Sequence, residues 1–179
     1  MDVSMEKSKS RSGRKLEIVD FVLRFAAIAA TLVAAIVMGR DKQTLDTPIG
    51  PIVAKYHYSP ANVFFVIANA IACVYAVFAI NNTTANIVYS RSPAFSKLLR
   101  AFFDLIMVAL LSASLGAAMG VGYIARKGNS HAFWSSICGL YGRFCHQGII
   151  SIASSLAATV LFVLLTTFSI YSLYKRSNS

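Results

Sequence analysis

The sequence predicts an all-α membrane protein, a four-transmembrane-helix bundle with both termini in the cytoplasm. Two observations lead to this prediction. Four apolar segments are each close to 20 residues long or longer, and about 20 helical residues cross the roughly 30 Å hydrocarbon core of a bilayer. In addition, 56% of the 179 residues are hydrophobic and 13% are charged, whereas a soluble domain carries about 25% charged residues. One membrane domain with short tails therefore accounts for nearly the whole chain.

The predicted segments alternate between membrane helices and polar connections. The four transmembrane helices are residues 21–39, 62–80, 101–124 and 148–173. The connections are an outer loop at 40–61, a cytoplasmic loop at 81–100 and a second outer loop at 125–147, and the ends are a cytoplasmic basic tail at 1–20 and a cytoplasmic tail at 174–179.

Two of the polar segments carry expectations about local structure. The basic tail is rich in Ser, Lys and Arg, and we expect it to be disordered and to orient the chain in the membrane. Its serines alternate with its bases, so a lipid-binding tail tuned by phosphorylation is the alternative. The loop at 40–61 contains Pro48, Pro51 and Pro60, and we expect it to be irregular.

The distribution of basic residues predicts the topology. With the N-terminus inside, ten basic residues lie on the cytoplasmic side and six lie outside. The inner set is Lys7, Lys9, Arg11, Arg14, Lys15, Arg91, Lys97, Arg100, Lys175 and Arg176; the outer set is Arg40, Lys42, Lys55, Arg126, Lys127 and Arg143. Because cytoplasmic loops carry the excess of Lys and Arg, both termini are predicted to be inside.

Two charges lie inside apolar segments. Asp104 is the single charged residue of 101–124, and Arg24 lies about one turn into the first span. A charge at the centre of a membrane helix costs about 2.5–3.5 kcal/mol on insertion scales. In the predicted topology the first and third helices both enter from the cytoplasm, so Arg24 and Asp104 lie at similar depth. Their opposite charges at matched depth predict an intramembrane ion pair. The alternative is that Arg24 extends to the near interface by itself.

The third span contains two rows of small residues. Ser112, Gly116 and Gly120 form one row, and Ser114, Ala118 and Gly122 form an adjacent one. Small residues let membrane helices approach closely. We predict that Ser112, Gly116 and Gly120 serve helix packing and oligomerisation, and the alternative is that both rows pack inside one subunit.

Two of the three cysteines lie in the second outer loop. Cys138 and Cys145 are predicted to face the oxidising exterior, where a disulfide is the simplest fate. His146 and His131 are close in sequence and would be needed for a metal site. Their spacing matches no standard zinc pattern, so no metal is predicted.

Other classes of function find little support in the sequence. Motifs of the common nucleotide-binding, hydrolase, metalloprotease and kinase families are absent, so neither an enzyme nor a cofactor is predicted. The net charge of +10 is spread over tails and loops without a basic–aromatic module, so nucleic-acid binding is not predicted either. A channel assembled from several copies stays open as an alternative.

Several motifs resemble the plant Casparian strip membrane domain protein-like (CASP-like) family, subfamily 1, which is related to the four-span MARVEL group. The resemblance extends from about Glu17 to the end of the chain. The motifs are Leu23-Arg24, Thr31-Leu32, Val37-Met38-Gly39, Lys42-Gln43-Thr44, Ser59-Pro60-Ala61, Phe64-Phe65-Val66, Ala68-Asn69-Ala70-Ile71, Asp104, residues 126–131, Trp134, Cys138 and Phe144-Cys145. The basic and acidic transmembrane residues of the family pattern correspond to Arg24 and Asp104.

The resemblance implies a non-enzymatic plasma-membrane scaffold. Such a scaffold self-associates into membrane subdomains, forms homo-oligomers and hetero-oligomers with related four-span proteins, and recruits extracellular cell-wall-modifying enzymes. The first outer loop lacks the aromatic-rich signature of the members that form Casparian strips. Scaffold capacity is therefore expected and strip formation is not. The alternative function is an oligomeric small-solute or ion channel or transporter subunit.

Overall fold

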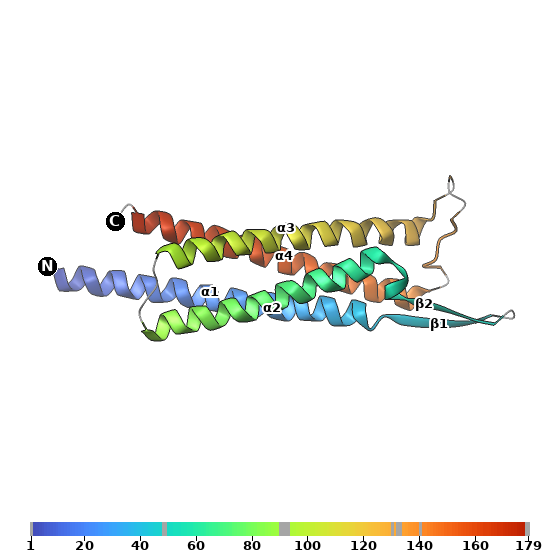
Figure 1. Ribbon diagram of the computed structural model, residues 1–179, viewed down its shortest axis with the longest axis horizontal. Helices are drawn as coiled ribbons and strands as arrows, with labels where there is room; N and C mark the ends of the chain where they lie inside the picture. The colour runs from blue at the N-terminus through green and yellow to red at the C-terminus, as the bar shows by residue number, and fades with distance from the viewer. Residues whose placement is uncertain are drawn as a thin grey trace.

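The computed structural model describes residues 2–47, 50–89, 94–129, 131, 134–139 and 141–177. The described chain contains four long α-helices: α1 (Asp2–Gly39), α2 (Pro60–Tyr89), α3 (Ala94–Lys127) and α4 (Gly142–Ser177). They run up and down in turn, so both ends of the chain lie at one end of the bundle (Figure 1). All four contain a segment long and apolar enough to cross a membrane. The predicted four-helix membrane fold is confirmed, and the side of the membrane on which the termini lie stays a prediction.

The helices extend beyond the predicted spans. α2 continues to Tyr89 and α3 begins at Ala94, so helical residues occupy most of the segment expected to be the cytoplasmic loop. α4 likewise begins at Gly142, before the expected span at 148–173. Hydropathy marks the part of a helix that fits the hydrocarbon core, whereas backbone hydrogen bonding decides where the helix ends.

The N-terminal tail is helical in the structure. α1 begins at Asp2 and continues without a break into the first span, so the expectation of a disordered tail is wrong. Lys, Arg, Met and Glu are good helix formers, and the tail contains no proline. The polarity of the tail suggested disorder, whereas its helical propensity decides the observed structure.

The first outer loop is also more regular than expected. Strands β1 (Lys42–Thr47) and β2 (Gly50–Lys55) form an antiparallel hairpin, followed by the short 3₁₀ helix η1 (Tyr56–Tyr58). Pro51 lies within β2, opposite Asp46. A two-stranded ribbon has a free edge on each strand, and a proline without an N–H group is tolerated there. The prediction of an irregular loop was therefore wrong.

Each helix of the bundle packs against two neighbours, and the buried residues lie on the faces between them. α1 and α3 each pack against both α2 and α4, so α1 and α3 lie on one diagonal. Buried positions recur every three or four residues, as in Arg24, Ala27, Thr31, Ala34 and Met38 of α1. This spacing is typical of helices that pack nearly parallel in a bundle.

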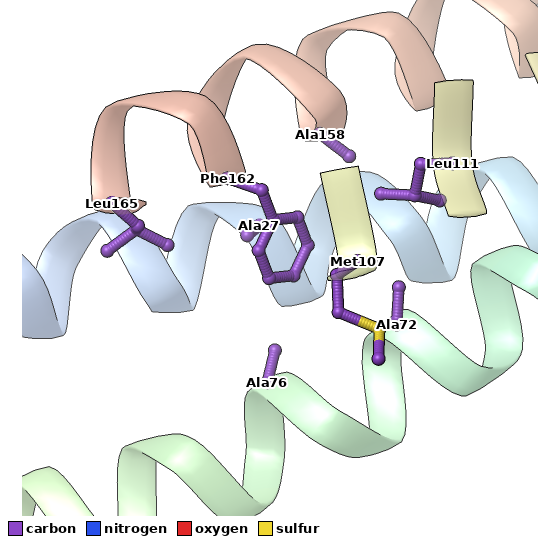
Figure 2. Packing of buried hydrophobic residues seen from close by; sticks show 8 residues of the cluster. All are labelled: Ala27, Ala72, Ala76, Met107, Leu111, Ala158, Phe162 and Leu165. Carbon is purple, nitrogen blue, oxygen red and sulfur yellow. The ribbon is translucent and has the colours of Figure 1, made fainter. Parts of the chain in front are cut away.

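Small side chains dominate the buried faces, with a few large ones filling the middle. Figure 2 shows Phe162 of α4 reaching into the space between the helices, near Ala27 of α1 and Ala76 of α2. Because lipid is as apolar as the core, close contact between backbones stabilises such a bundle more than the burial of apolar surface does. The alanine-rich faces permit that contact.

Candidate functional site: a buried polar network and a disulfide-linked end

An ion pair joins the two helices on the diagonal of the bundle. Arg24 of α1 donates two hydrogen bonds to Asp104 of α3, from Nη1 to Oδ1 at 3.0 Å and from Nη2 to Oδ2 at 2.8 Å. Both side chains are fully buried. The arrangement is bidentate, which is the strongest geometry available to these two groups.

Three more residues complete the polar network of Asp20, Arg24, Tyr75, Arg100 and Asp104. Arg24 Nε donates to Asp20 Oδ2 at 3.1 Å, and Arg100 Nη1 lies 3.7 Å from the same oxygen. The Tyr75 hydroxyl of α2 donates to Asp104 Oδ1 at 2.8 Å and lies 3.2 Å from the Arg100 carbonyl oxygen. Two arginines and two aspartates balance in charge, so the network holds no net charge. This balance offsets part of the cost of taking ions out of water.

The structure brings the predicted pair together and adds partners that sequence analysis missed. Arg24 bonds to Asp104 and also to Asp20 near the end of the span, so it does not extend to the interface by itself. Two of the missed residues had a signal in the sequence. Asp20 lies four positions before Arg24, and Arg100 lies four positions before Asp104, the spacing at which helical side chains meet. Tyr75 had no such signal.

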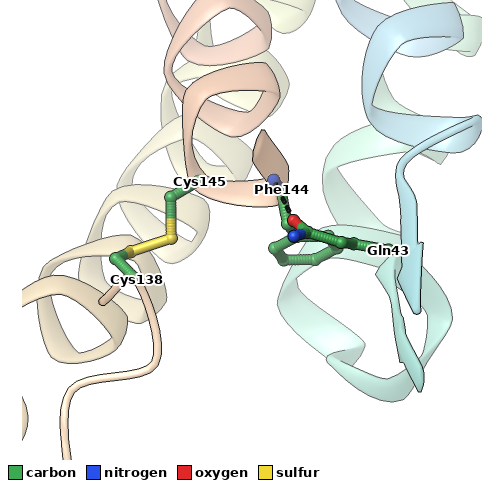
Figure 3. Close-up of a disulfide and its surroundings, with 4 residues drawn as sticks. All are labelled: Gln43, Cys138, Phe144 and Cys145. Atoms are coloured by element: carbon green, nitrogen blue, oxygen red, sulfur yellow. Dashed lines mark hydrogen bonds between the residues drawn. A yellow bond between two sulfur atoms is a disulfide. The ribbon is translucent and has the colours of Figure 1, made fainter. Parts of the chain in front are cut away.

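At the opposite end, a disulfide ties the second outer loop to the first turn of α4. Cys138 and Cys145 are bonded, with their Cα atoms 5.7 Å apart (Figure 3). The structure therefore brings this predicted pair together too. Bonded in this way, neither sulfur is available as a thiolate ligand. No group of three or more His, Cys, Asp or Glu residues in the described part of the chain could hold a metal ion.

Hydrogen bonds fix the loop before the disulfide. The Ile137 and Cys138 amides both donate to the Ala125 carbonyl oxygen, at 2.8 Å and 3.1 Å. Gly128 has a φ of +72°, and a Cβ placed there would lie 2.6 Å from the Trp134 carbonyl oxygen. Only glycine fits this turn without a rearrangement.

The hairpin is joined to the same end of α4. The Phe144 amide donates to Gln43 Oε1 of β1 at 2.8 Å (Figure 3). Amides in the first turn of a helix have no partner within the helix, so the Gln43 side chain satisfies one of them. The disulfide and this bond together anchor both predicted outer loops at the start of α4.

The two small-residue rows of α3 have different surroundings. Ser114 and Ala118 are buried, and a Cβ on Gly122 would lie 3.9 Å from Ile152 of α4. Ser112, Gly116 and Gly120, which we call the exposed stripe, lie on the outer surface. A Cβ on Gly116 or Gly120 would meet no described atom within 4 Å. Within the described part of the chain, the two glycines of the exposed stripe therefore do not pack against another helix.

Comparison with known proteins identifies the family of this chain. The model of the Casparian strip membrane protein domain matches residues 13–161. The chain belongs to the Casparian strip membrane protein family. Casparian strip membrane protein 1 of Picea glauca is 40% identical over 168 residues, covering 93% of this chain and 88% of its own. CASP-like protein 1E1 of Ricinus communis is 40% identical, covering 94% of this chain and 89% of its own.

Casparian strip membrane protein 6 of Oryza sativa subsp. indica is 41% identical over 165 residues and covers 91% of this chain and 88% of its own. No protein of solved structure matches the chain. The family and the four long apolar helices together make this a multi-pass membrane protein. The matched region contains the ion pair, the disulfide and the exposed stripe.

Proposed function

We propose that this member of the Casparian strip membrane protein family is a non-enzymatic scaffold of the plasma membrane. It self-associates into membrane subdomains, pairs with related four-span proteins and recruits cell-wall-modifying proteins to its outer face. The observation that carries the proposal is the exposed stripe on α3: its small residues permit close helix contact, and a Cβ on Gly116 or Gly120 would meet no described atom within 4 Å. The names of the relatives agree with a role at a specialised membrane region.

The occupant proposed for the exposed stripe is the same helix of a second copy. Ser112 to Gly120 rises about 12 Å, enough for one helix crossing. Glycine in a helix costs roughly 0.5–1 kcal/mol relative to alanine, and a neighbouring backbone packed closely against the glycines offsets that cost. A stripe repeated on every copy can meet itself, which suits a protein that assembles laterally.

The polar network supports a structural role for its charges. It joins α1, α2 and α3, and its arginines and aspartates are engaged with one another. Phe65, Leu111, Phe162 and Leu165 are fully buried and fill the middle of the bundle. An electroneutral interior whose middle is filled favours a rigid building block over a conducting pore within one chain.

The proposed orientation places both termini in the cytoplasm and the hairpin and disulfide outside. Its support is the ten-to-six distribution of basic residues and the presence of both termini at one end of the bundle. Asn81 and Asn82 each begin a glycosylation sequon in α2. They lie toward the end of the bundle that holds both chain termini. A glycan found on either residue in the native protein would contradict this orientation.

Two measurements test the scaffold. The tagged protein in a plant cell should form patches at the plasma membrane whose fluorescence recovers slowly after bleaching. The purified protein in liposomes should leave ion and small-solute flux at the level of empty liposomes. Fast recovery together with flux above that level would favour the channel subunit instead.

A further inference from the structure

A cavity of about 600 Å³ lies at the hairpin end of the bundle, between the ends of all four helices. Most of its wall is apolar, with Ala118, Met119, Val121, Ile149 and Ile152 among the lining residues. The disulfide and Phe144, which Figure 3 shows at the start of α4, also line it. Its volume is in the range of pockets that hold small molecules. Neither the ion pair nor the exposed stripe accounts for this cavity.

One buried carboxylate lines this cavity. Asp41 is 1% exposed, and neither of its carboxylate oxygens accepts a hydrogen bond from the described part of the chain. The Asp41 amide donates to the Met38 carbonyl oxygen, and the Asp41 carbonyl accepts from the Tyr56 amide, so its backbone is fixed between α1 and η1. A buried polar group without a partner is destabilising, and a ligand with a hydrogen-bond donor would satisfy it.

The charges around the cavity narrow the class of ligand. Arg126 and His146 line it, and the positive charge of Arg143 acts on Asp41. These bases disfavour a cationic ligand. Burial raises the pKa of Asp41 to about 7, with Arg143 as a smaller opposing influence, so an anionic ligand would meet a carboxylate that is partly charged at neutral pH. An uncharged donor fits both protonation states, because a carboxylic acid can still accept a hydrogen bond.

We propose that this cavity binds an uncharged, mostly apolar molecule through a hydroxyl group that donates to Asp41. Asn62 also lines the cavity, and its side-chain amide offers a second polar contact. Two sources share this chemistry: a sterol from the bilayer and a small alcohol from the aqueous side. The inference is independent of self-association, since the exposed stripe does not line the cavity.

The experiment uses the full-length protein in phosphatidylcholine nanodiscs. Menthol is titrated against menthone, which has the same carbon skeleton without the hydroxyl group, and binding is followed by calorimetry. Dehydroergosterol tests the bilayer source, because Trp134 is the one tryptophan of the chain and can transfer energy to this fluorescent sterol. We expect either tighter binding of menthol than of menthone or saturable energy transfer to dehydroergosterol. The first result would identify a small alcohol from the aqueous side as the ligand, and the second a sterol from the bilayer.

Two variants place the binding in the cavity. Asp41→Ala should weaken binding about tenfold to a hundredfold, the usual effect of losing a hydrogen bond to a charged group. Gly148→Leu should abolish binding while the bundle stays folded, because Gly148 lines the cavity and a Cβ there would meet no described atom within 4 Å. Equal affinity for menthol and menthone without sterol transfer, or binding that both variants leave unchanged, would overturn the proposal.

Discussion

Arg24 and Asp104 face each other across the diagonal of the bundle, with each guanidinium Nη atom bonded to its own carboxylate oxygen. The helices that carry them both pack against α2 and α4. The pair therefore fixes the separation and rotation of two helices that lie on opposite corners. Tyr75 ties α2 to the same carboxylate, so one buried site positions three helices.

Removing either member of the ion pair should destabilise the bundle strongly. Arg24→Ala or Asp104→Ala leaves one charge buried without its partner, which costs about 3–5 kcal/mol. We expect less protein at the cell surface and a lower melting temperature in detergent. The double exchange Arg24→Asp with Asp104→Arg should recover part of both. A double variant as unstable as the single ones would show that the two charges act independently.

The Tyr75 hydroxyl should contribute less than the ion pair. Tyr75→Phe removes one donor to the Asp104 carboxylate, and losing a hydrogen bond to a charged group costs about 1.5–3 kcal/mol. Thermal unfolding of the purified protein measures this change. Tyr123→Phe is the matched control, because Tyr123 is on the exposed surface of α3. Equal melting temperatures for the two variants would contradict a role for Tyr75 in the polar network.

The disulfide should order the loop more than it stabilises the whole fold. Cys138 and Cys145 are seven positions apart, and closing so short a ring contributes about 2 kcal/mol or less. An impermeant maleimide should label neither cysteine without prior reduction. After Cys138→Ser with Cys145→Ser, iodide should quench Trp134 fluorescence more strongly. Full labelling of both thiols in the unreduced native protein would show that the bond does not form.

The pH dependence of stability should report on Asp41. Its pKa is raised by burial to about 7 from an ordinary value of 3.8, so between these values the folded state binds more protons than the unfolded state. Stability should therefore fall as pH rises from about 4 to about 7, by up to about 4 kcal/mol, and then level off. Asp41→Asn should remove most of this slope in melting experiments, with Arg143, Arg126 and His146 left in place. An unchanged slope would assign it to another group.

Sequence patterns predicted the parts of this fold that depend on membrane physics. The four spans follow from hydropathy, and the pairing of Arg24 with Asp104 follows from the high cost of a lone charge in lipid and from matched depth. Tyr75 and Asp41 could not be found in this way. Their surroundings depend on how the helices are rotated and on where the hairpin meets the bundle, which no local pattern specifies. The hairpin was missed because the prolines of this segment were taken to break regular structure, although the edge of a two-stranded ribbon accepts Pro51.

Self-association through the exposed stripe on α3 is the basis of the proposed scaffold. The most direct measurement is energy transfer between differently tagged copies in one membrane. Gly116→Leu with Gly120→Leu should reduce transfer severalfold while the protein still reaches the cell surface. Ala153→Leu with Ala157→Leu is the matched control, because it places the same side chain at the same spacing on an exposed face of α4. Transfer should fall in the glycine variant alone; full transfer in the glycine variant would show that copies do not meet through this stripe.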